Sequence, residues 1–323
     1  MNKLPFEENK KIFVKREAET NKDFGCKPEE RKTEEIINYG IINLNKPSGP
    51  TSHLTTDYVK KILNINKAGH SGSLDPKVTG VLPIALGRAT RIVQTLLKSG
   101  KEYVGVMRLH KEVSEKEIFD NVEKFIGKIE QLPPVRSAVK RRLRERSVYY
   151  FKILEIDGKN VLFRVGVEAG TYIRKLIHDF SKELGINGHM SHLVRTRVAC
   201  FSDKDWVSLH DLKDAYELYK SGDDKEIRRI INPVEKGVEH LNNIWVNDNC
   251  VDTLCHGADL NIPGIVKLNE VKKDELVAIM TLKDELVCLG ICEMDYSDVL
   301  KNEKGKVVKT RKVFMERGLY KKV

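Results

Sequence analysis

The chain has 323 residues, 57 Lys and Arg against 47 Asp and Glu, a net charge of +10 and an isoelectric point near 9.1. A hydrophobic fraction of 40% excludes a disordered protein, and the length suits two domains. The basic balance favours a polyanionic partner, nucleic acid before membrane. Apolar runs such as residues 81–86 are too short to span a bilayer and the N-terminus is charged throughout, so we expect a cytoplasmic protein.

The six cysteines do not follow a strong metal-binding pattern. They are Cys26, Cys200, Cys250, Cys255, Cys288 and Cys292. None of the spacings is the two-residue knuckle of a zinc site, and the last two lie in apolar, strand-like sequence where a thiol packs as a small hydrophobe. We therefore expect no metal. Glutamine occurs at two positions only while Lys and Glu abound, a bias of heat-adapted proteins, so an intracellular disulfide stays open.

Residues 1–35 read as a charged N-terminal arm with one apolar triplet, residues 12–14. Two interpretations of the triplet are open: an edge strand on a distant part of the fold, or part of a disordered arm. Order is predicted from residue 39, with a strand over residues 39–45 that the segment 46–50 ends.

A helix capped by Thr51 or Ser52 is predicted next, and another over residues 88–99. The positions of the first helix that keep the 3.6-residue period, and are expected to face inward, are Leu54, Tyr58, Val59, Ile62 and Leu63.

The segment 69–76, Gly-His-Ser-Gly-Ser-Leu-Asp-Pro, lies between these helices and is the most informative stretch of the chain. Its glycines permit backbone angles that other residues avoid, and Pro76 disfavours a helical conformation at Asp75. The Asp75 carboxylate is therefore presented from a loop, near His70. The same residue types make ordinary turns, so this segment alone does not distinguish a catalytic loop from a turn.

The middle of the chain combines strands, helices and a basic segment. Strands are predicted over residues 102–109, with Tyr103 at the start, and over 148–156 and 161–167, a hairpin turning at Asp157-Gly158. A helix is predicted over 115–126. The nearly single-signed basic segment 136–146, which includes Lys140, Arg141 and Arg142, favours phosphate contact over a merely solvated face.

Residues 170–174 open a helix whose apolar stripe runs from Ile173 to Leu184 and which Gly185 ends. Tyr172 and Arg174 lie in its first turn, off that stripe, where a helix N-terminus favours anions. A strand over 190–200 and short helices over 209–219 and 225–231 follow. From Trp245, short apolar strands separated by Gly, Asp and Pro predict a small β-barrel.

In this order the segments resemble the motifs of the TruB/dyskerin family of RNA pseudouridine synthases, and most closely its archaeal box H/ACA branch. The matching segments are 43–52, 69–76 with Gly80, 101–103, 133–134 with 137–140, 170–174, and Leu193 with 195–196. Segments 256–260, 263–265 and 277–281 resemble a PUA domain, a small RNA-binding barrel. The resemblance covers about residues 36–320.

The resemblance implies an α+β protein: an arm (1–35), a catalytic domain (36–244) with an extended, mostly antiparallel sheet flanked by helices, and a PUA domain (245–323). It implies isomerisation of uridine to pseudouridine without a cofactor, in the tRNA T loop, in rRNA through a box H/ACA guide RNA, or in both. Implied partners are these RNAs, small Nop-type and Gar-type accessory proteins and a kink-turn-binding homologue of a ribosomal protein.

The resemblance also assigns roles to single residues. Asp75 matches the catalytic aspartate, which attacks the sugar or assists its deprotonation, and Arg174 the cation beside it. Tyr103 matches the aromatic that stacks on the target base, Tyr172 and Leu193 its pocket walls, and His70 a residue of the RNA cleft.

Two other functions fit the sequence less well. A non-catalytic RNA-binding scaffold has no need of a carboxylate in a cationic cleft. A phosphate-binding loop at residues 69–80 lacks the Gly-Lys-Ser/Thr ending that such loops require.

Overall fold

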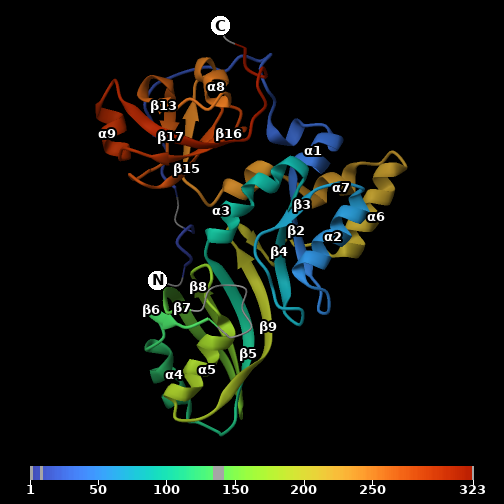
Figure 1. Cartoon of the computed structure of the whole chain (residues 1–323), viewed down its shortest axis with the longest axis vertical. Helices are drawn as coiled ribbons and strands as arrows, with labels where there is room; N and C mark the ends of the chain where they lie inside the picture. Colours follow the sequence, from blue (N-terminus) through green and yellow to red (C-terminus); the bar gives the residue numbers. More distant parts are fainter. Residues whose placement is uncertain (1–2, 8–9, 134–141, 322–323) are drawn as a thin grey trace. The chain divides into compact units, whose positions relative to one another are not determined.

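The computed structural model describes residues 3–7, 10–133 and 142–321, and the chain divides into two compact units (Figure 1). The first comprises Met1–Glu7 and Ile41–Ile231, and the second Glu8–Gly40 and Asn232–Val323. Most of the N-terminal arm thus belongs to the same unit as the C-terminal barrel.

The first unit is built on a mixed sheet in which most neighbouring strands are antiparallel. From β2 the strand order is β2-β4-β9-β5-β8-β7-β6, with β3 beside β4 and β10 beside β9. The strands are β2 (Gly40–Lys46), β3 (Ala68–His70), β4 (Thr79–Leu86), β5 (Lys101–Leu109), β6 (Gly127–Gln131), β7 (Arg144–Asp157), β8 (Asn160–Val167), β9 (Gly188–Val198) and β10 (Phe201–Ser202). Strands β4 and β9 run parallel, pairing Gly80 with Arg195. The predicted α+β fold is confirmed.

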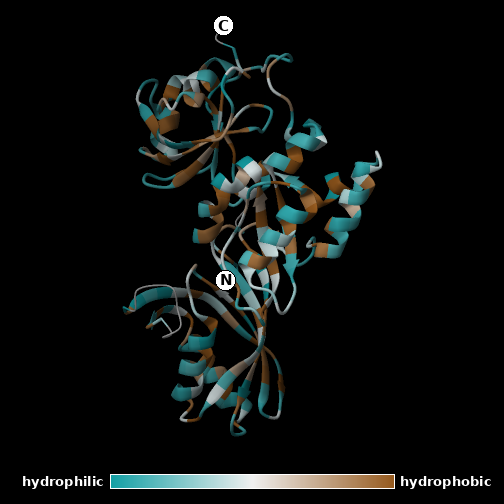
Figure 2. Ribbon diagram, turned by 45° about the vertical axis from the view of Figure 1, so that its right-hand side comes forward, coloured by the Kyte–Doolittle hydropathy of each residue, from teal (hydrophilic) through white to brown (hydrophobic). Residues whose placement is uncertain are grey.

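Helices cover this sheet. They are α2 (Ser52–Leu63), the 3-10 helix η2 (Gly87–Ile92), α3 (Val93–Lys98), α4 (Glu115–Glu123), α5 (Ile173–Glu183), α6 (Leu209–Lys220) and α7 (Lys225–Ile230). Helices α4 and α5 lie against the part of the sheet that contains β5, β7, β8 and β9 (Figure 1). Hydrophobic colouring gathers on the strands and on helix faces turned toward them (Figure 2).

Thr51 caps α2 as predicted, accepting a hydrogen bond from the Leu54 N–H at 3.1 Å. Two details of the predicted helices are wrong. Leu54 and Tyr58 are 40% and 37% exposed, because the buried face of α2 uses Thr55 and Thr56 beside Val59. The single helix predicted over residues 88–99 begins instead as the 3-10 helix η2 and becomes α-helical only from Val93.

The segments that hold the candidate site follow the sequence pattern closely. Strands β7 and β8 form the predicted hairpin, with Gly158 at φ +54° in its turn. Helix α5 buries its predicted stripe, Ile173, Leu176, Ile177 and Phe180, in one core with β5, β7 and β8. This stripe fixes which way the first turn of α5 points its polar side chains.

The second unit contains another sheet, of order β1-β14-β12-β15-β16-β17-β13. The elements of this unit are β1 (Phe13–Val14), η1 (Pro28–Glu30), α1 (Thr33–Tyr39), η3 (Val234–Val238), β12 (Asn243–Val246), α8 (Asp248–Cys255), β13 (Leu260–Asn261), η4 (Ile262–Gly264), β14 (Ile265–Leu268), β15 (Leu276–Met280), β16 (Leu286–Cys292), α9 (Tyr296–Lys301) and β17 (Lys306–Val313). Strand β11 (Ile231–Pro233) begins at the last residue of the first unit and is an edge strand of the sheet that contains β2. The strands predicted after Trp245 are present, whereas α1, α8 and α9 were not predicted.

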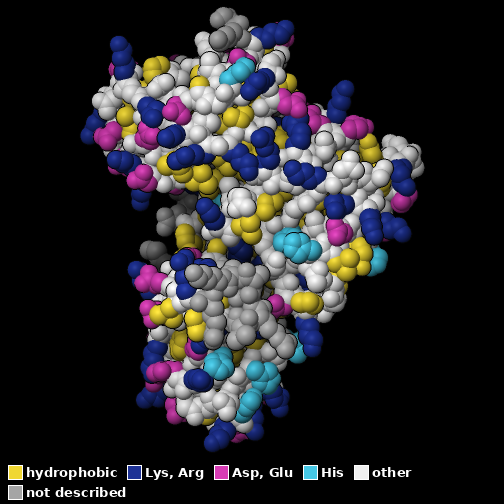
Figure 3. All heavy atoms as spheres, viewed as in Figure 1, with side chains coloured by type: hydrophobic (Ala, Val, Ile, Leu, Met, Phe, Trp, Pro, Cys, Tyr) yellow, Lys and Arg dark blue, Asp and Glu magenta, His cyan; other side chains and the backbone are white. Residues whose placement is uncertain are grey.

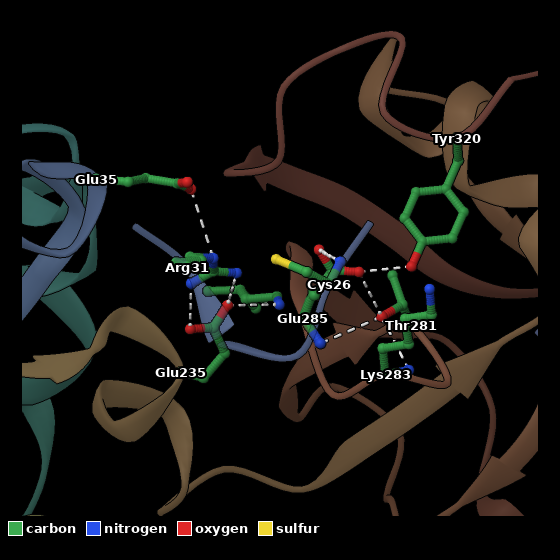
Figure 4. Close-up of polar contacts among 9 residues, drawn as sticks. Cys26, Arg31, Glu35, Glu235, Thr281, Lys283, Glu285 and Tyr320 are labelled. Atoms are coloured by element: carbon green, nitrogen blue, oxygen red, sulfur yellow. Dashed lines mark hydrogen bonds and ion pairs between the residues drawn. The ribbon is translucent and has the colours of Figure 1, made fainter. Parts of the chain in front are cut away.

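Residues 13–14 of the arm form strand β1 at the edge of this sheet, so the disordered interpretation of the apolar triplet is wrong and the edge-strand interpretation is confirmed. Strand β1 pairs Phe13 with Leu268 of β14. Farther along, Arg31 forms two 2.8 Å hydrogen bonds with the Glu235 carboxylate (Figure 4). Glu285 accepts hydrogen bonds from the Tyr320 hydroxyl and from the Cys26 N–H (Figure 4). Removing one partner of a buried ion pair such as Arg31–Glu235 is destabilising, because the other charge is left buried without a partner.

The six cysteines are free thiols in the structure. Burial raises the pKa of Cys250 and of Cys288 to about 12. These thiols therefore remain protonated and pack as small apolar groups. Among the described residues no cluster of three His, Cys, Asp or Glu side chains could hold a metal ion.

Candidate active site

The candidate site begins at the turn that carries Asp75. The Val78 N–H donates to the Asp75 carbonyl at 3.0 Å, which closes a turn with Pro76 in its second position. Just before it, Gly72 has φ +126°, a conformation that favours glycine. Asp75 is therefore outside any helix or strand, as predicted, and its side chain leaves the loop from a fixed backbone.

Buried Lys46 is hydrogen-bonded to the backbone of this turn. Its ammonium donates to the carbonyls of Pro47, Pro76 and Val78 at 2.8, 3.0 and 3.0 Å, so each of its three N–H groups has an acceptor. Burial lowers the pKa of Lys46, and nearby Arg195 lowers it further. No role for Lys46 follows from the sequence, because two of its acceptors lie 30 and 32 residues farther along the chain and a backbone carbonyl leaves no sequence signal.

Asp75 and Arg174 form an ion pair, from segments 99 residues apart. The Nε atom of Arg174 lies 3.0 Å from Oδ2 of Asp75, and Nη2 lies 3.4 Å from Oδ1, a two-point contact of a guanidinium with a carboxylate. Both side chains are 49% exposed, so the pair is open to an incoming ligand. The neighbouring carboxylate of Glu168 has a different partner: Nη1 of Arg146 lies 3.7 Å from it.

A cavity of about 520 Å³ opens beside this pair. It is lined by Gly72, Ser73, Leu74, Asp75, Val78, Leu97, Lys101, Tyr103, Gly170, Thr171, Tyr172, Ile173, Arg174, Met190, Leu193 and Arg195. The structure thus brings together five of the residues singled out in the sequence: Asp75, Tyr103, Tyr172, Arg174 and Leu193. An aromatic and aliphatic wall with one carboxylate and several cations suits a flat, polar ring attached to phosphate.

Two buried cations in the cavity lining were not assigned roles from the sequence. Arg195 is 1% exposed and donates to the carbonyls of Val81 and Gly72 at 2.8 and 3.1 Å. Burial lowers its pKa, an effect that interaction with Tyr103 partly offsets. Lys101 donates to three carbonyls at the end of α3, and burial with the nearby Arg195 charge lowers its pKa to about 7.

The other predicted binding residues lie apart from the cavity or outside the described part of the chain. His70, on β3, is not among the cavity lining; its Nδ1 accepts from the Gly72 N–H at 3.3 Å and its ring packs on His53. Burial lowers the pKa of His70 to about 4, so the imidazole is neutral. Arg142 is exposed, and Lys140 and Arg141 lie outside the described residues.

Comparison with known proteins connects this geometry to a family. The model of the TruB family pseudouridylate synthase N-terminal domain matches residues 60–173, and that of the tRNA pseudouridylate synthase B C-terminal domain matches 174–239. A curated relative from Pyrococcus horikoshii, "Probable tRNA pseudouridine synthase B", is 55% identical over 324 residues, covering 99% of this chain and 97% of that protein. The chain belongs to the TruB family of pseudouridylate synthases.

Further comparisons extend the TruB match across the chain. A DKCLD domain matches residues 2–54 and a PUA domain residues 242–314. The relative from Methanopyrus kandleri, with the same printed name, is 52% identical over 322 residues, covering 99% of this chain and 95% of that protein.

Solved structures support the same family assignment. The structure titled "Crystal Structure of a Cbf5-Nop10-Gar1 Complex" contains a chain that is 53% identical, with a TM-score of 0.95 and coverage of 100% of this chain and 99% of that one. "Structure of H/ACA RNP bound to a substrate RNA containing 2'-deoxyuridine" contains one that is 51% identical, with a TM-score of 0.93 and coverage of 99% of both chains. The predicted resemblance to TruB enzymes and the predicted isomerase class are confirmed. In the described part of the chain, no helix has the length and apolar character needed to cross a membrane.

Proposed function

We propose that this TruB-family enzyme isomerises uridine to pseudouridine in RNA, in the tRNA T loop, in rRNA selected by a box H/ACA guide RNA, or in both. The observation that carries the proposal is the Asp75–Arg174 pair, open to a cavity with aromatic walls. A non-catalytic scaffold has no use for a paired carboxylate there. The relatives are named for tRNA, whereas a close structural match is titled as an H/ACA ribonucleoprotein with its substrate RNA.

In this proposal the target uridine leaves its stack and enters the cavity, because Asp75 cannot reach a base inside a helix. Tyr103 stacks on the base, and Tyr172 and Leu193 bound it. Asp75 then attacks the sugar or assists its deprotonation, the bond between C1′ of the ribose and N1 of the base breaks, and the base turns. A new bond joins C5 of the base to C1′ as Asp75 is released, and the proton lost from C5 is balanced by one gained at N1. Arg174 holds the Asp75 carboxylate in the orientation that this step requires.

RNA placement is proposed to lie outside the cavity. Lys and Arg side chains are numerous on the surface of each unit (Figure 3). We assign catalysis to residues 36–244, RNA placement to the PUA domain over 245–323 and to the segment with Lys140, Arg141 and Arg142, and support of the PUA domain to the arm over 1–35. His70 lines the path of the RNA. The enzyme works in the cytoplasm, where its RNA substrates are.

The proposed partners are guide RNA, Nop-type and Gar-type accessory proteins and a kink-turn-binding homologue of a ribosomal protein. A structural match is titled as a complex with Nop10 and Gar1. The deciding experiment maps pseudouridine in tRNA and in an rRNA fragment, first with this chain alone and then with guide RNA and the accessory proteins. We expect rRNA modification only in the assembled reaction. Absence of pseudouridine in every reaction would overturn the proposal.

A prediction follows for Arg174→Lys, which keeps the charge but loses the planar fork that contacts both Asp75 oxygens. We expect turnover to fall by about ten- to hundredfold, roughly 1.4–2.7 kcal/mol of transition-state stabilisation, with a much smaller change in RNA affinity. Single-turnover rates and RNA-binding titrations measure the two effects separately. Arg229→Lys, at an exposed pair with Glu226 on α7, is the matched control and should leave both unchanged. If weaker binding accounts for the whole loss at Arg174, this residue contacts phosphate and not the carboxylate.

A further inference from the structure

One buried side chain makes both of its polar contacts to the backbone of a cavity residue. Gln131, the last residue of β6, is 2% exposed. Its Oε1 accepts from the Tyr172 N–H at 3.0 Å, and its Nε2 donates to the Tyr172 carbonyl at 3.2 Å. Two neighbours in an antiparallel ladder exchange the same pair of bonds, so the Gln131 amide takes the place of a strand beside Tyr172.

The contact falls at the start of α5, where the backbone passes from the Thr171 turn into the helix. Tyr172 is the N-cap residue, with extended angles of φ −92° and ψ 104°, and its side chain makes no capping bond. The Tyr172 carbonyl also accepts the first helical bond, from the Leu176 N–H at 2.9 Å. Without Gln131 the Tyr172 N–H would lose its side-chain acceptor, and of these bonds to the Tyr172 backbone only the one from the Leu176 N–H would remain.

This turn carries two of the groups on which the proposed chemistry depends. The Tyr172 side chain lines the cavity, and Arg174, two residues later, contacts both oxygens of Asp75. Hydrogen bonds at both the N–H and the carbonyl of the N-cap residue restrain sliding and rotation of that end of the helix. Displacement of such groups by about 1 Å costs up to about a hundredfold in rate.

We infer that Gln131 is a positioning residue for the reaction: its side-chain amide sets the first turn of α5 so that Tyr172 and Arg174 meet the target uridine and Asp75 correctly. The inference deepens the proposed function and rests on it. Gln131 contacts the backbone of Tyr172 and acts through that residue.

The same helix offers a matched control at its other end. Asn121 of α4 is 3% exposed, and its Nδ2 donates to the Phe180 carbonyl of α5 at 3.0 Å. Both Gln131 and Asn121 are therefore buried amides bonded to the α5 backbone. Only Gln131 is bonded near Arg174.

The test compares Gln131→Met and Asn121→Leu in the guide-loaded complex and on tRNA. Both variants should lower the denaturation midpoint of the chain. We expect Gln131→Met to lower kcat by about ten- to hundredfold with KM changed less than about threefold, and Asn121→Leu to keep kcat within about twofold. Equal losses of kcat in the two variants, or an unchanged kcat in Gln131→Met, would overturn the positioning role.

A second variant, Gln131→Glu, tests the donor half of the contact. Its carboxylate can still accept from the Tyr172 N–H, but it can donate to the Tyr172 carbonyl only when protonated. Activity relative to the unaltered enzyme should therefore rise as pH falls through the pKa of the new carboxyl, which burial raises. A constant activity ratio across pH would contradict the inference.

Hydrogen exchange of the free chain separates this inference from the function itself. In Gln131→Met the amides of Tyr172 and Leu176, which have hydrogen-bond acceptors in this turn, should exchange faster while the Leu184 amide, bonded to the Phe180 carbonyl, stays protected. Asn121→Leu should give the reverse pattern. If the unaltered enzyme forms no pseudouridine on any RNA, the proposed function fails although the exchange result stands. If exchange at residues 172–176 is unchanged in Gln131→Met, the positioning role fails whatever the activity.

Discussion

Asp75→Asn should reduce pseudouridine formation by at least about four powers of ten, roughly 5 kcal/mol of transition-state stabilisation. The substitution keeps the volume of the side chain and the backbone carbonyl that closes the turn with Val78. It removes the carboxylate that attacks the sugar or takes its proton, and neither role is open to an amide. Single-turnover assays on guide-selected RNA and on tRNA measure the loss.

RNA affinity should change little in this variant, because the surfaces assigned to RNA placement are untouched. Asp179→Asn is the matched control: it removes a carboxylate from α5 that pairs with Lys175 away from the cavity lining. Its turnover should equal that of the unaltered enzyme. An Asp75→Asn variant that still forms pseudouridine at a comparable rate would show that another group does the chemistry.

The sequence predicted well the parts of the site that depend on local rules. The Asp75 turn follows from Pro76 and two glycines, and the direction of Arg174 follows from the apolar stripe of α5. The hairpin of β7 and β8 follows from alternation around Gly158. In each case, residues within one turn or one strand determine the outcome.

What escaped prediction depends on contacts between distant segments. Lys46 supports the Asp75 turn through carbonyl oxygens, and Gln131 holds Tyr172 across 41 residues, also through the backbone. Nearly every residue offers the same backbone groups, so no sequence pattern reveals these hydrogen bonds. Whether the arm is ordered likewise depends on the pairing of residues 13–14 with β14, more than 250 residues later in the chain. The short helices α1, α8 and α9 have too few turns for periodicity to identify them.

The largest expected effect on stability is at Gly80, where the two parallel strands of the first unit meet. A Cβ added there would lie 2.2 Å from the Arg195 carbonyl oxygen and 2.7 Å from its nitrogen, and both atoms belong to the backbone. Gly80 also has φ +110°. Gly80→Ala must therefore bear a strained conformation and push β4 away from β9, so we expect the free energy of unfolding of this unit to fall by about 4 kcal/mol or more.

Gly49→Ala separates these two costs, because Gly49 has φ +109° but nothing within 4 Å of an added Cβ. It should lose only the conformational part, about 1–2 kcal/mol. The two tryptophans lie one in each unit, so a Trp245→Phe background leaves Trp206 to report denaturant unfolding of the first unit. Since β4 leads out of the Asp75 turn and β9 carries Arg195, Gly80→Ala should also lower turnover before the unit unfolds. Equal stability losses at Gly49 and Gly80 would mean that β4 and β9 can move apart at little cost in free energy. The close contact of these strands would then not determine where Arg195 lies in the cavity lining.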